Sequence, residues 1–201
     1  HPLYDNFGAK ISTAEARDFL GISKNEKVIL FFGFIRKYKG LDVLFEAMPH
    51  LKNTGIKLLV AGEFYEDRKP YDEQITQLGI QDQLILRTDF IPDSEVKYYL
   101  CAADLVVQPY RNATQSGVTP LAYHFEKPMI VTNVGALPDY VPDQKVGLVA
   151  EPVASALAES TRQYFQLGEE YFLPQLREEK KKYSWPVLVQ QVIELAGSIK
   201  N

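Results

Sequence analysis

Two cations stand in one short turn of the sequence, where they could bind an anion. Arg36 and Lys39 lie within residues 33–40, between an apolar run and a segment whose apolar residues recur at helical spacing. Taken alone, each cation could equally well be an ordinary surface residue or part of a binding site. Both of them in one turn, directly after a buried strand, favour a fixed positive site. Such cations are suited to a phosphate or diphosphate, whose charge they would balance.

A second polar segment, residues 110–117, carries hydroxyl and amide side chains and ends in a glycine where helical periodicity begins. Pro120 cannot donate a hydrogen bond to a preceding turn, so the helix is expected to begin close to Gly117. Thr114 or Ser116 would cap it. Free backbone N–H groups and the positive end of the helix dipole would then face a ligand, which again suits phosphate. The alternative for this segment alone is an ordinary turn between a strand and a helix.

The elements that must position these groups alternate along the chain. Short runs that are apolar on both faces are typical of buried parallel strands, and segments with helical spacing separate them. The alternation predicts an α/β fold with a doubly wound parallel sheet and helices on both faces. Ligands of such sheets collect at the carboxyl ends of the strands, where the two polar turns should meet. The expected strands are residues 28–34, 56–61, 84–86 continuing to Phe90, 105–107, 129–131 and 146–150.

The chain divides into three parts. Residues 1–26 read as an extended segment and a short helix, with a capping box at Ser12 and an end at Gly21. Residues 27–167 carry the sheet. Residues 168–201 contain only helical patterns, which would pack on the sheet unit or on a missing domain, and the charged run 177–182 reads as a solvated helix face. The length of 201 residues fits one domain, and a start without Met suggests a piece of a longer protein.

Composition and motifs exclude several classes of function. The net charge of -4 argues against a nucleic-acid partner, and no stretch reaches the roughly 20 apolar residues of a transmembrane helix. The single cysteine, Cys101, agrees with a reducing compartment, so we expect a cytoplasmic protein, with peripheral contact at the inner membrane face as an option for the full length. No metal-binding, dinucleotide-binding, Walker or Gly-x-Ser-x-Gly motif is present, and we expect no bound metal.

Three stretches, taken in order, resemble a known family. They are FFGFIRKYKGLDVLFEAM, LLVAGE and FIPDSEVKYYLCAADLVVQPYRNATQSGVTPLAYHFEKPMIVTNVGALPDYV. Each is weak evidence alone, but together they are similar to the carboxyl-terminal half of the group 1 glycosyltransferases, the retaining GT-B family four, over residues 27–165. The resemblance implies a Rossmann-like, donor-binding domain. It also implies that an acceptor-binding amino-terminal domain is missing from this chain.

The resemblance assigns roles to individual residues. Arg36 and Lys39 match the cations that hold the donor diphosphate and stabilise its departure, and Gly33 begins their turn. The other expected contacts are with the base for Phe90 and Ile91, with the base or ribose for Glu63, and with the diphosphate and sugar for Gln115, Ser116 and Gly117. The implied ligand is a nucleoside-diphosphate sugar, linked to UDP or GDP, with no cofactor.

The sequence departs from the family at three positions. Most members carry two glutamates eight positions apart, and Ala113 and Leu121 stand in their places. Phe34 occupies the commonest position of the family's arginine. The expected function is retaining transfer of a sugar to an acceptor glycan or lipid-linked sugar, with no turnover by this domain alone. The alternative is a non-catalytic nucleotide-binding or scaffold domain. A GT-B epimerase or phosphorylase fits less well, since no acid/base histidine and carboxylate gather in the expected site.

Overall fold

A parallel sheet with the order β3-β2-β1-β4-β5-β6 organises the part of the chain that the computed structural model describes, residues 3–198. The winding reverses between β1 and β4, the two neighbours at the centre of the sheet, as in doubly wound sheets. The predicted Rossmann-like α/β fold is therefore confirmed. The strands are β1 (Lys27–Phe32), β2 (Ile56–Ala61), β3 (Leu84–Arg87), β4 (Leu105–Gln108), β5 (Met129–Thr132) and β6 (Gly147–Ala150).

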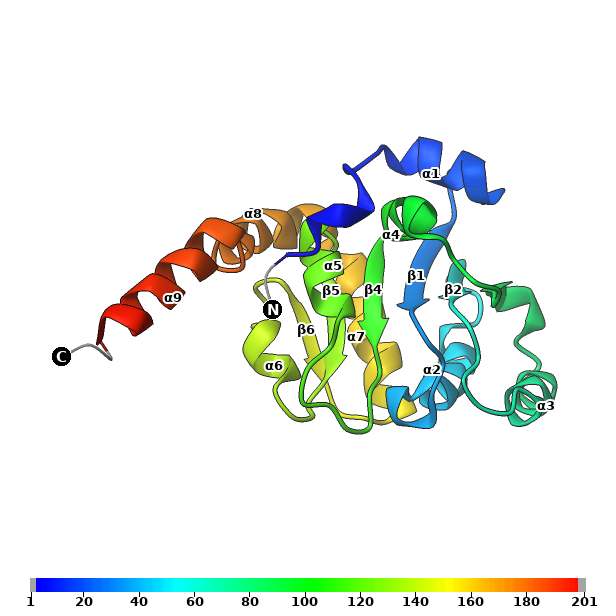
Figure 1. Cartoon of the computed structure of the whole chain (residues 1–201). Coiled ribbons are helices and arrows are strands. Elements are labelled where there is room, and N and C mark those ends of the chain that lie inside the picture. The colour runs from blue at the N-terminus through cyan, green and yellow to red at the C-terminus, as the bar shows by residue number, and fades with distance from the viewer. Residues whose placement is uncertain (1–2, 199–201) are drawn as a thin grey trace.

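Helices cover both faces of the sheet (Figure 1). Alternate residues of each central strand face opposite cores: Val28 and Leu30 pack beneath α4 and α5, whereas Ile29 and Phe31 pack against α2 and α7. This explains why the strands read as continuous apolar runs. The helices are α1 (Thr13–Leu20), α2 (Leu41–Ala47), α3 (Lys69–Leu78), α4 (Val96–Ala102), α5 (Val118–His124), α6 (Leu137–Tyr140), α7 (Ala154–Leu167), α8 (Glu169–Lys181) and α9 (Trp185–Ser198), with short 3-10 turns that include η1 (Asp5–Phe7), η2 (Lys37–Lys39) and η5 (Asp93–Glu95).

Two strands are shorter than their apolar runs suggested. β1 ends at Phe32 because Gly33 takes a φ of 95°, a left-handed conformation that breaks the extended backbone. β3 ends at Arg87, and the expected continuation to Phe90 is wrong. β3 pairs only with β2 at the edge of the sheet and is only partly buried, so little holds the following residues in a ladder. The chain leaves the sheet there and leaves Phe90 70% exposed.

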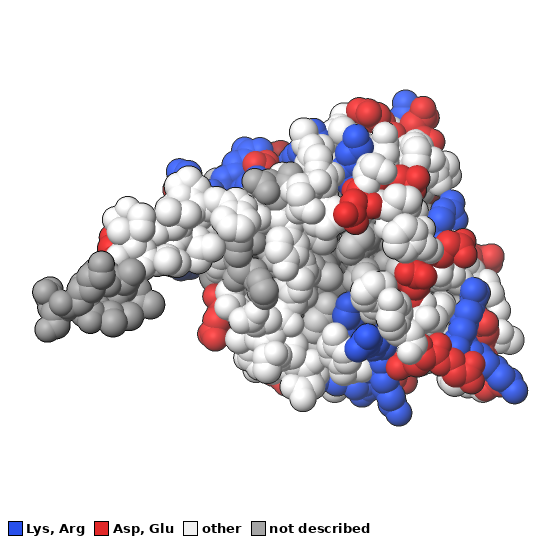
Figure 2. All heavy atoms as spheres, viewed as in Figure 1, with Lys and Arg blue, Asp and Glu red and all other residues white. Residues whose placement is uncertain are grey.

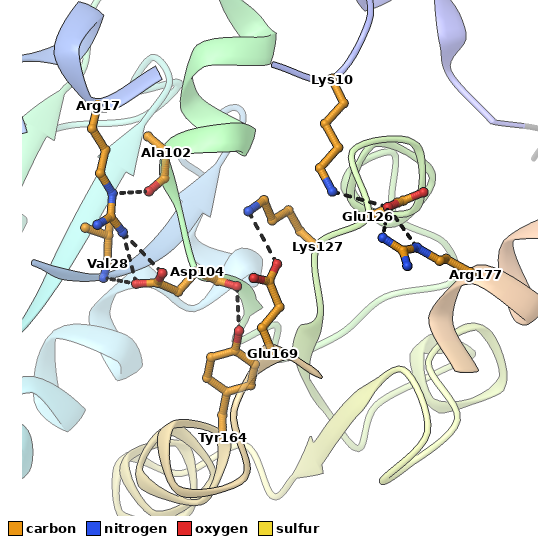
Figure 3. A network of polar contacts seen from close by, with 10 residues as sticks. All are labelled: Lys10, Arg17, Val28, Ala102, Asp104, Glu126, Lys127, Tyr164, Glu169 and Arg177. Carbon is orange, nitrogen blue, oxygen red and sulfur yellow. Dashed lines mark hydrogen bonds and ion pairs between the residues drawn. The ribbon is translucent and has the colours of Figure 1, made fainter. Parts of the chain in front are cut away.

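The buried side chain of Arg17 connects α1 to the sheet through hydrogen bonds (Figure 3). The predicted cap is present, since Ser12 Oγ accepts from the Glu15 N–H at 3.1 Å. Arg17 donates from Nε to the carbonyl of Ala102 at 2.9 Å and from Nη2 to the carboxylate of Asp104 at 3.2 Å. That carboxylate also accepts from the N–H of Val28, the second residue of β1. The pair therefore holds α1 against the amino ends of β1 and β4, opposite the edge where ligands gather.

The last two helices differ in their surroundings. α8 packs on the domain through Phe172 and Leu176, which are fully buried. The expectation of a solvated face holds for most of 177–182, including the exposed Arg177, which pairs with Glu126 of the α5–β5 turn at 3.1 Å. Glu179 and Lys180 are only partly exposed, so there the expectation is wrong. α9 projects from the body of the molecule and shows a mostly uncharged surface (Figure 2). None of the helices described here is long and apolar enough to cross a bilayer.

Candidate functional site

A pocket opens at the carboxyl ends of β1 and β2, beside the start of α5. It lies next to the point where the winding of the sheet reverses, which is the usual ligand position of this architecture. Residues that follow β1, β2 and β3 meet residues of α4 and α5 there. The pocket is lined by Phe7, Phe32, Gly33, Phe34, Lys39, Gly62, Glu63, Phe90, Ile91, Asp93, Val96, Gly117, Val118 and Leu121.

The structure brings together most of the site residues that the sequence suggested. Those found in this pocket are Gly33, Lys39, Glu63, Phe90, Ile91 and Gly117. Gln115 and Ser116 instead line a separate, smaller pocket, whose other walls include Tyr123, Tyr140 and Tyr183. Arg36 lines neither of these two pockets. The turn after β1 and the start of α5 therefore meet as expected, whereas the polar 110–117 segment is divided between two cavities.

The floor of the larger pocket is backbone. Gly62 approaches Gly33 so closely that a β-carbon on Gly62 would stand 2.3 Å from the Gly33 carbonyl oxygen. Both residues have positive φ, 137° and 95°, which L side chains rarely adopt. Because neither residue carries a side chain, the two turns can touch and leave the space above them open. A ligand could therefore lie close to the main chain here.

Lys39 supplies a buried positive charge at this floor. The residue is 9% exposed, and its Nζ lies 3.2 Å from the position that a β-carbon on Gly33 would take. The ammonium also lies 5.8 Å from the centroid of the Tyr110 ring, and it makes no ion pair with a carboxylate of the described residues. Burial first, and then the neighbouring Arg36, lower the pKa of Lys39 to about 8. An anionic ligand would restore the stability of its charged form.

Arg36 takes a more exposed position. Its backbone is extended, and its guanidinium lies 5.1 Å from the ring centroid of Tyr65 as a cation–π contact. It is nevertheless close enough to Lys39 to depress the pKa of that group. Arg36 thus stands beside the pocket rather than in its wall, from where a change of rotamer could direct its charge toward a ligand.

Ser116 is occupied by contacts within the protein. Its Oγ accepts from the Val118 N–H, the first amide of α5, at 3.2 Å. The N-cap residue of α5 is Gly117, so the sequence placed the start of the helix correctly but not its cap. The same oxygen lies 3.1 Å from the hydroxyl of Tyr110, whose pKa is raised by burial. One N–H at the start of α5 is therefore already satisfied by Ser116. The exposed Gln115 is the side chain of this pair that is free to turn toward solvent.

Sequence reasoning missed the apolar wall of the pocket. Phe32 and Phe34 flank the predicted glycine, so their positions could have been inferred from the turn itself. Val96 comes from the inner face of α4, where helical periodicity marks it only as a core residue. Leu121 of α5 also lines the pocket, and the family resemblance had already marked its position. Phe7 comes from the amino-terminal segment, and no local pattern connects it with the turn after β1.

These groups can bind a ligand of mixed character. Aromatic and aliphatic side chains would cover a flat apolar ring, the ammonium of Lys39 would balance an anion, and the carboxylates of Glu63 and Asp93 could accept hydrogen bonds from hydroxyls or a base. Among the described residues no cluster of His, Cys, Asp or Glu is placed to hold a metal ion. The pocket therefore combines the chemical features that recognition of a nucleotide requires.

Curated proteins with similar sequences are glycosyltransferases. The D-inositol 3-phosphate glycosyltransferase of Segniliparus rotundus is 33% identical over 143 residues, which are 69% of this chain and 32% of that protein. The enzyme of the same name from Corynebacterium urealyticum is 29% identical over 96% of this chain and 48% of its own length. The chain thus spans about half, or less, of the length of these curated relatives.

Solved structures share the fold. Anabaena Alr3699/HepE in complex with UDP-glucose matches 96% of this chain and 55% of its own, with a TM-score of 0.82 and 20% sequence identity. A carboxyl-terminal domain of a group 1 glycosyl transferase, LpcC from Francisella tularensis, matches 89% of this chain and 96% of its own, with a TM-score of 0.74 and 21% identity. The chain therefore has the fold of one half of a GT-B glycosyltransferase.

The family-level match covers most of the sequence. Residues 12–183 match the family described as "Glycosyl transferases group 1". This range runs from the cap of α1 to the end of α8 and includes the whole sheet and every strand that borders the pocket. The chain belongs to the group 1 glycosyl transferases.

Proposed function

We propose that this chain is the donor-binding domain of a retaining glycosyltransferase, which moves a sugar from a nucleoside-diphosphate sugar to an acceptor hydroxyl. The observation that carries the proposal is the buried ammonium of Lys39, which has no carboxylate partner among the described residues and stands over a glycine floor at the ligand end of the sheet. Family membership supports the reaction class. The UDP and UDP-glucose complexes of HepE support the ligand class.

In this proposal, different residues contact different parts of the donor. Lys39 balances the diphosphate, and Arg36 adds a second charge from the rim. Phe90 and Ile91 border the base, and Glu63 accepts from the base or the ribose. The backbone at Gly117 approaches the phosphate and sugar, with Gln115 and Ser116 in the adjoining loop.

Charge stabilisation is the main catalytic contribution of this domain. As the bond to the sugar breaks, negative charge grows on the departing nucleoside diphosphate, and Lys39 and Arg36 favour that charge. A donor phosphate oxygen assists the incoming hydroxyl on the same face of the sugar, so the configuration is retained. The nucleotide sugar is a substrate, and the proposal requires no cofactor. We place this chemistry in the cytoplasm.

A second domain completes the enzyme in this proposal. The chain spans 32% and 48% of two curated relatives, and α9 exposes the apolar side chains of Trp185, Val189, Val192 and Ile193. An amino-terminal domain that holds the acceptor glycan or lipid-linked sugar would cover that face. Because the site is assembled only when both domains close, the isolated chain is expected to bind donor without turnover.

A non-catalytic scaffold is the second candidate, and one feature favours it. Leu121 lines the pocket with an aliphatic side chain, and the side chain of the buried Ala113 likewise offers no acceptor for sugar or ribose hydroxyls. A scaffold would need no affinity for nucleotides.

Calorimetric titration of the chain with UDP, GDP and ADP separates the two candidates, with uridine and inorganic diphosphate as partial ligands. Saturable binding of one diphosphate nucleotide, tighter than either partial ligand, supports the donor site. Absence of binding by all three nucleotides would instead favour the scaffold.

A further inference from the structure

The amino-terminal segment, residues 3–11, crosses the molecule beside the pocket and is called the strap below. The N–H of Leu3 donates to the carbonyl of Tyr183, just after α8, at 2.9 Å. The ring of Tyr4 then passes 3.7 Å from the position of a β-carbon on Gly117, at the start of α5. From there η1 brings Phe7 to the pocket, where it packs beside η5. The strap thus spans the distance from the end of α8 to the rim of the ligand site.

Contacts after Phe7 fix the strap in this course. The carbonyl of Gly8 lies 2.8 Å from Nε2 of His124, and Gly8 turns the chain with a φ of 91°. Lys10 then pairs with the carboxylate of Glu126 at 3.2 Å (Figure 3). Since these anchors lie on α5 and on the turn after it, the strap is held by the same helix that borders the pocket. Phe7 is therefore placed by several contacts outside the pocket.

Phe7 lies on the apolar side of the pocket. It is partly buried against the same core cluster as Phe32 and Ile91, and Val96 lines the cavity from α4. Lys39, the cation of the lining, stands over Gly33, whereas η1 and η5 contribute Phe7 and Asp93 to the lining and no cation. A nucleoside-diphosphate sugar has one flat, weakly polar part, its base, and the diphosphate will take the side with the ammonium. The base is then directed to the side with Phe7, where an aromatic ring can contact its face.

We propose that Phe7 contacts the base of the bound nucleotide and sets its affinity, so that the strap is part of the donor site. The inference rests on the proposed donor-binding function, because it requires a nucleotide in the larger pocket. It adds a determinant that lies outside the sheet and outside the turns that follow the strands. It also separates two kinds of contact: Phe7 acts on the base, whereas Lys39 acts on the diphosphate.

The test compares UDP with inorganic diphosphate by calorimetric titration of the parent chain and of Phe7→Ala. We expect UDP to bind about tenfold more weakly to Phe7→Ala, the loss typical of one aromatic contact with a base, and inorganic diphosphate to bind as it does to the parent. Phe19→Ala is the matched control: Phe19 is 51% exposed, stacks on Tyr98 and does not line the pocket, so both affinities should stay unchanged.

Phe7→Tyr keeps the test decisive if the alanine variant folds poorly, because it preserves the ring and should retain most of the UDP affinity. Equal UDP affinity of the parent and Phe7→Ala would overturn the inference and leave the donor site intact. A parallel loss of UDP and diphosphate affinity in folded Phe7→Ala would also overturn it, since Phe7 would then support the pocket as a whole. A parent chain that binds no nucleotide would overturn both this inference and the proposed function.

Discussion

The ammonium of Lys39 stands over Gly33: a β-carbon on Gly33 would lie 3.2 Å from Lys39 Nζ. The lysine and the glycine belong to one turn. The cation of the pocket and the glycine that leaves its floor without a side chain therefore come from the same eight residues, 33–40. Gly62 also lies against this turn, at the backbone of Gly33. A positive charge is therefore held close to exposed main chain, which is a suitable place for a phosphate group.

Nucleotide affinity should depend on pH through Lys39. The pKa of this group is lowered to about 8, and only its protonated form attracts phosphate. The terminal phosphate of UDP is already ionised above about pH 7. Affinity for UDP should therefore fall roughly tenfold between about pH 7 and pH 9. Calorimetric titrations across this range measure the effect.

Arg36→Ala serves as a probe of that assignment. Because Arg36 contributes to the lowered pKa of Lys39, its removal should move the inflection in UDP affinity to higher pH. An inflection that stays in place in Arg36→Ala, or a flat profile in the parent, would show that another group controls the pH dependence.

Gly62→Ala should be strongly destabilising. The new β-carbon would meet the Gly33 carbonyl oxygen at 2.3 Å, in addition to the strain of a φ of 137°. We expect a loss of about 2 to 4 kcal/mol in the free energy of unfolding, measured by urea denaturation. Gly21→Ala is the control for backbone strain without a steric clash, since the φ of Gly21 is 68° and nothing lies within 4 Å of the added β-carbon. Its cost should be only about 1 kcal/mol. Equal losses in the two variants would contradict the close approach of the two turns.

Ser116→Ala should reduce stability much more than nucleotide affinity. The substitution removes the acceptor of the Val118 N–H and leaves the buried hydroxyl of Tyr110 without this partner, at a cost of about 1 to 3 kcal/mol. UDP affinity should change by less than about twofold, because this hydroxyl is directed into the protein. The exposed Thr114→Ala is the control in the same loop and should be close to neutral. A large loss of UDP affinity in a stable Ser116→Ala variant would instead assign Ser116 to the ligand.

Glu126 should stabilise the fold through its cations. Burial alone raises the pKa of Glu126, but Lys10, Arg177 and Lys180 reverse this and hold the pKa below its usual value. A lowered folded-state pKa gives stability that is present above the unfolded-state pKa and is lost as pH falls through the folded-state value. Glu126→Gln should therefore be less stable than the parent by about 1 kcal/mol at neutral pH, and the difference should vanish in acid.

The backbone of Glu126 provides the control for that comparison. Its φ of 55° suits glycine, so Glu126→Gly loses the same ion pairs but gains relief of strain. Urea denaturation should find Glu126→Gly more stable than Glu126→Gln at every pH. Chemical denaturation curves of parent and Glu126→Gln that stay equally far apart down to strongly acidic pH would contradict the ion-pair account.

Local patterns predicted the sheet well because each strand carries its own signal. Val28 and Ile29 face opposite cores, so both must be apolar, and the run is readable without knowledge of its neighbours. The end of β3 was misjudged, since aromatic propensity at Phe90 says nothing about whether a partner strand extends that far. Gly33 marks the end of β1 through its backbone conformation.

The candidate site could be predicted only in part, because local patterns do not show which distant residues come together. Lys39 and Gly33 are neighbours in one turn, so their meeting follows from local sequence. Ser116 and Gly117 are adjacent in the chain but line different pockets, because the start of α5 separates the two cavities. Phe7 is brought to the pocket by contacts of its segment with the start of α5, with Tyr183 just after α8 and with η5. Such long-range placement has no periodic or compositional signal.

Titration of UDP into the parent chain, Lys39→Ala and Lys37→Ala tests the central claim most directly. Lys37 lies two residues away, is exposed and does not line the larger pocket, so it is the matched control. We expect Lys39→Ala to weaken UDP binding by about 10- to 100-fold, the loss of one charge-assisted contact, with Lys37→Ala close to the parent. Equal affinities for the parent and Lys39→Ala would contradict the assignment of this pocket to the donor diphosphate.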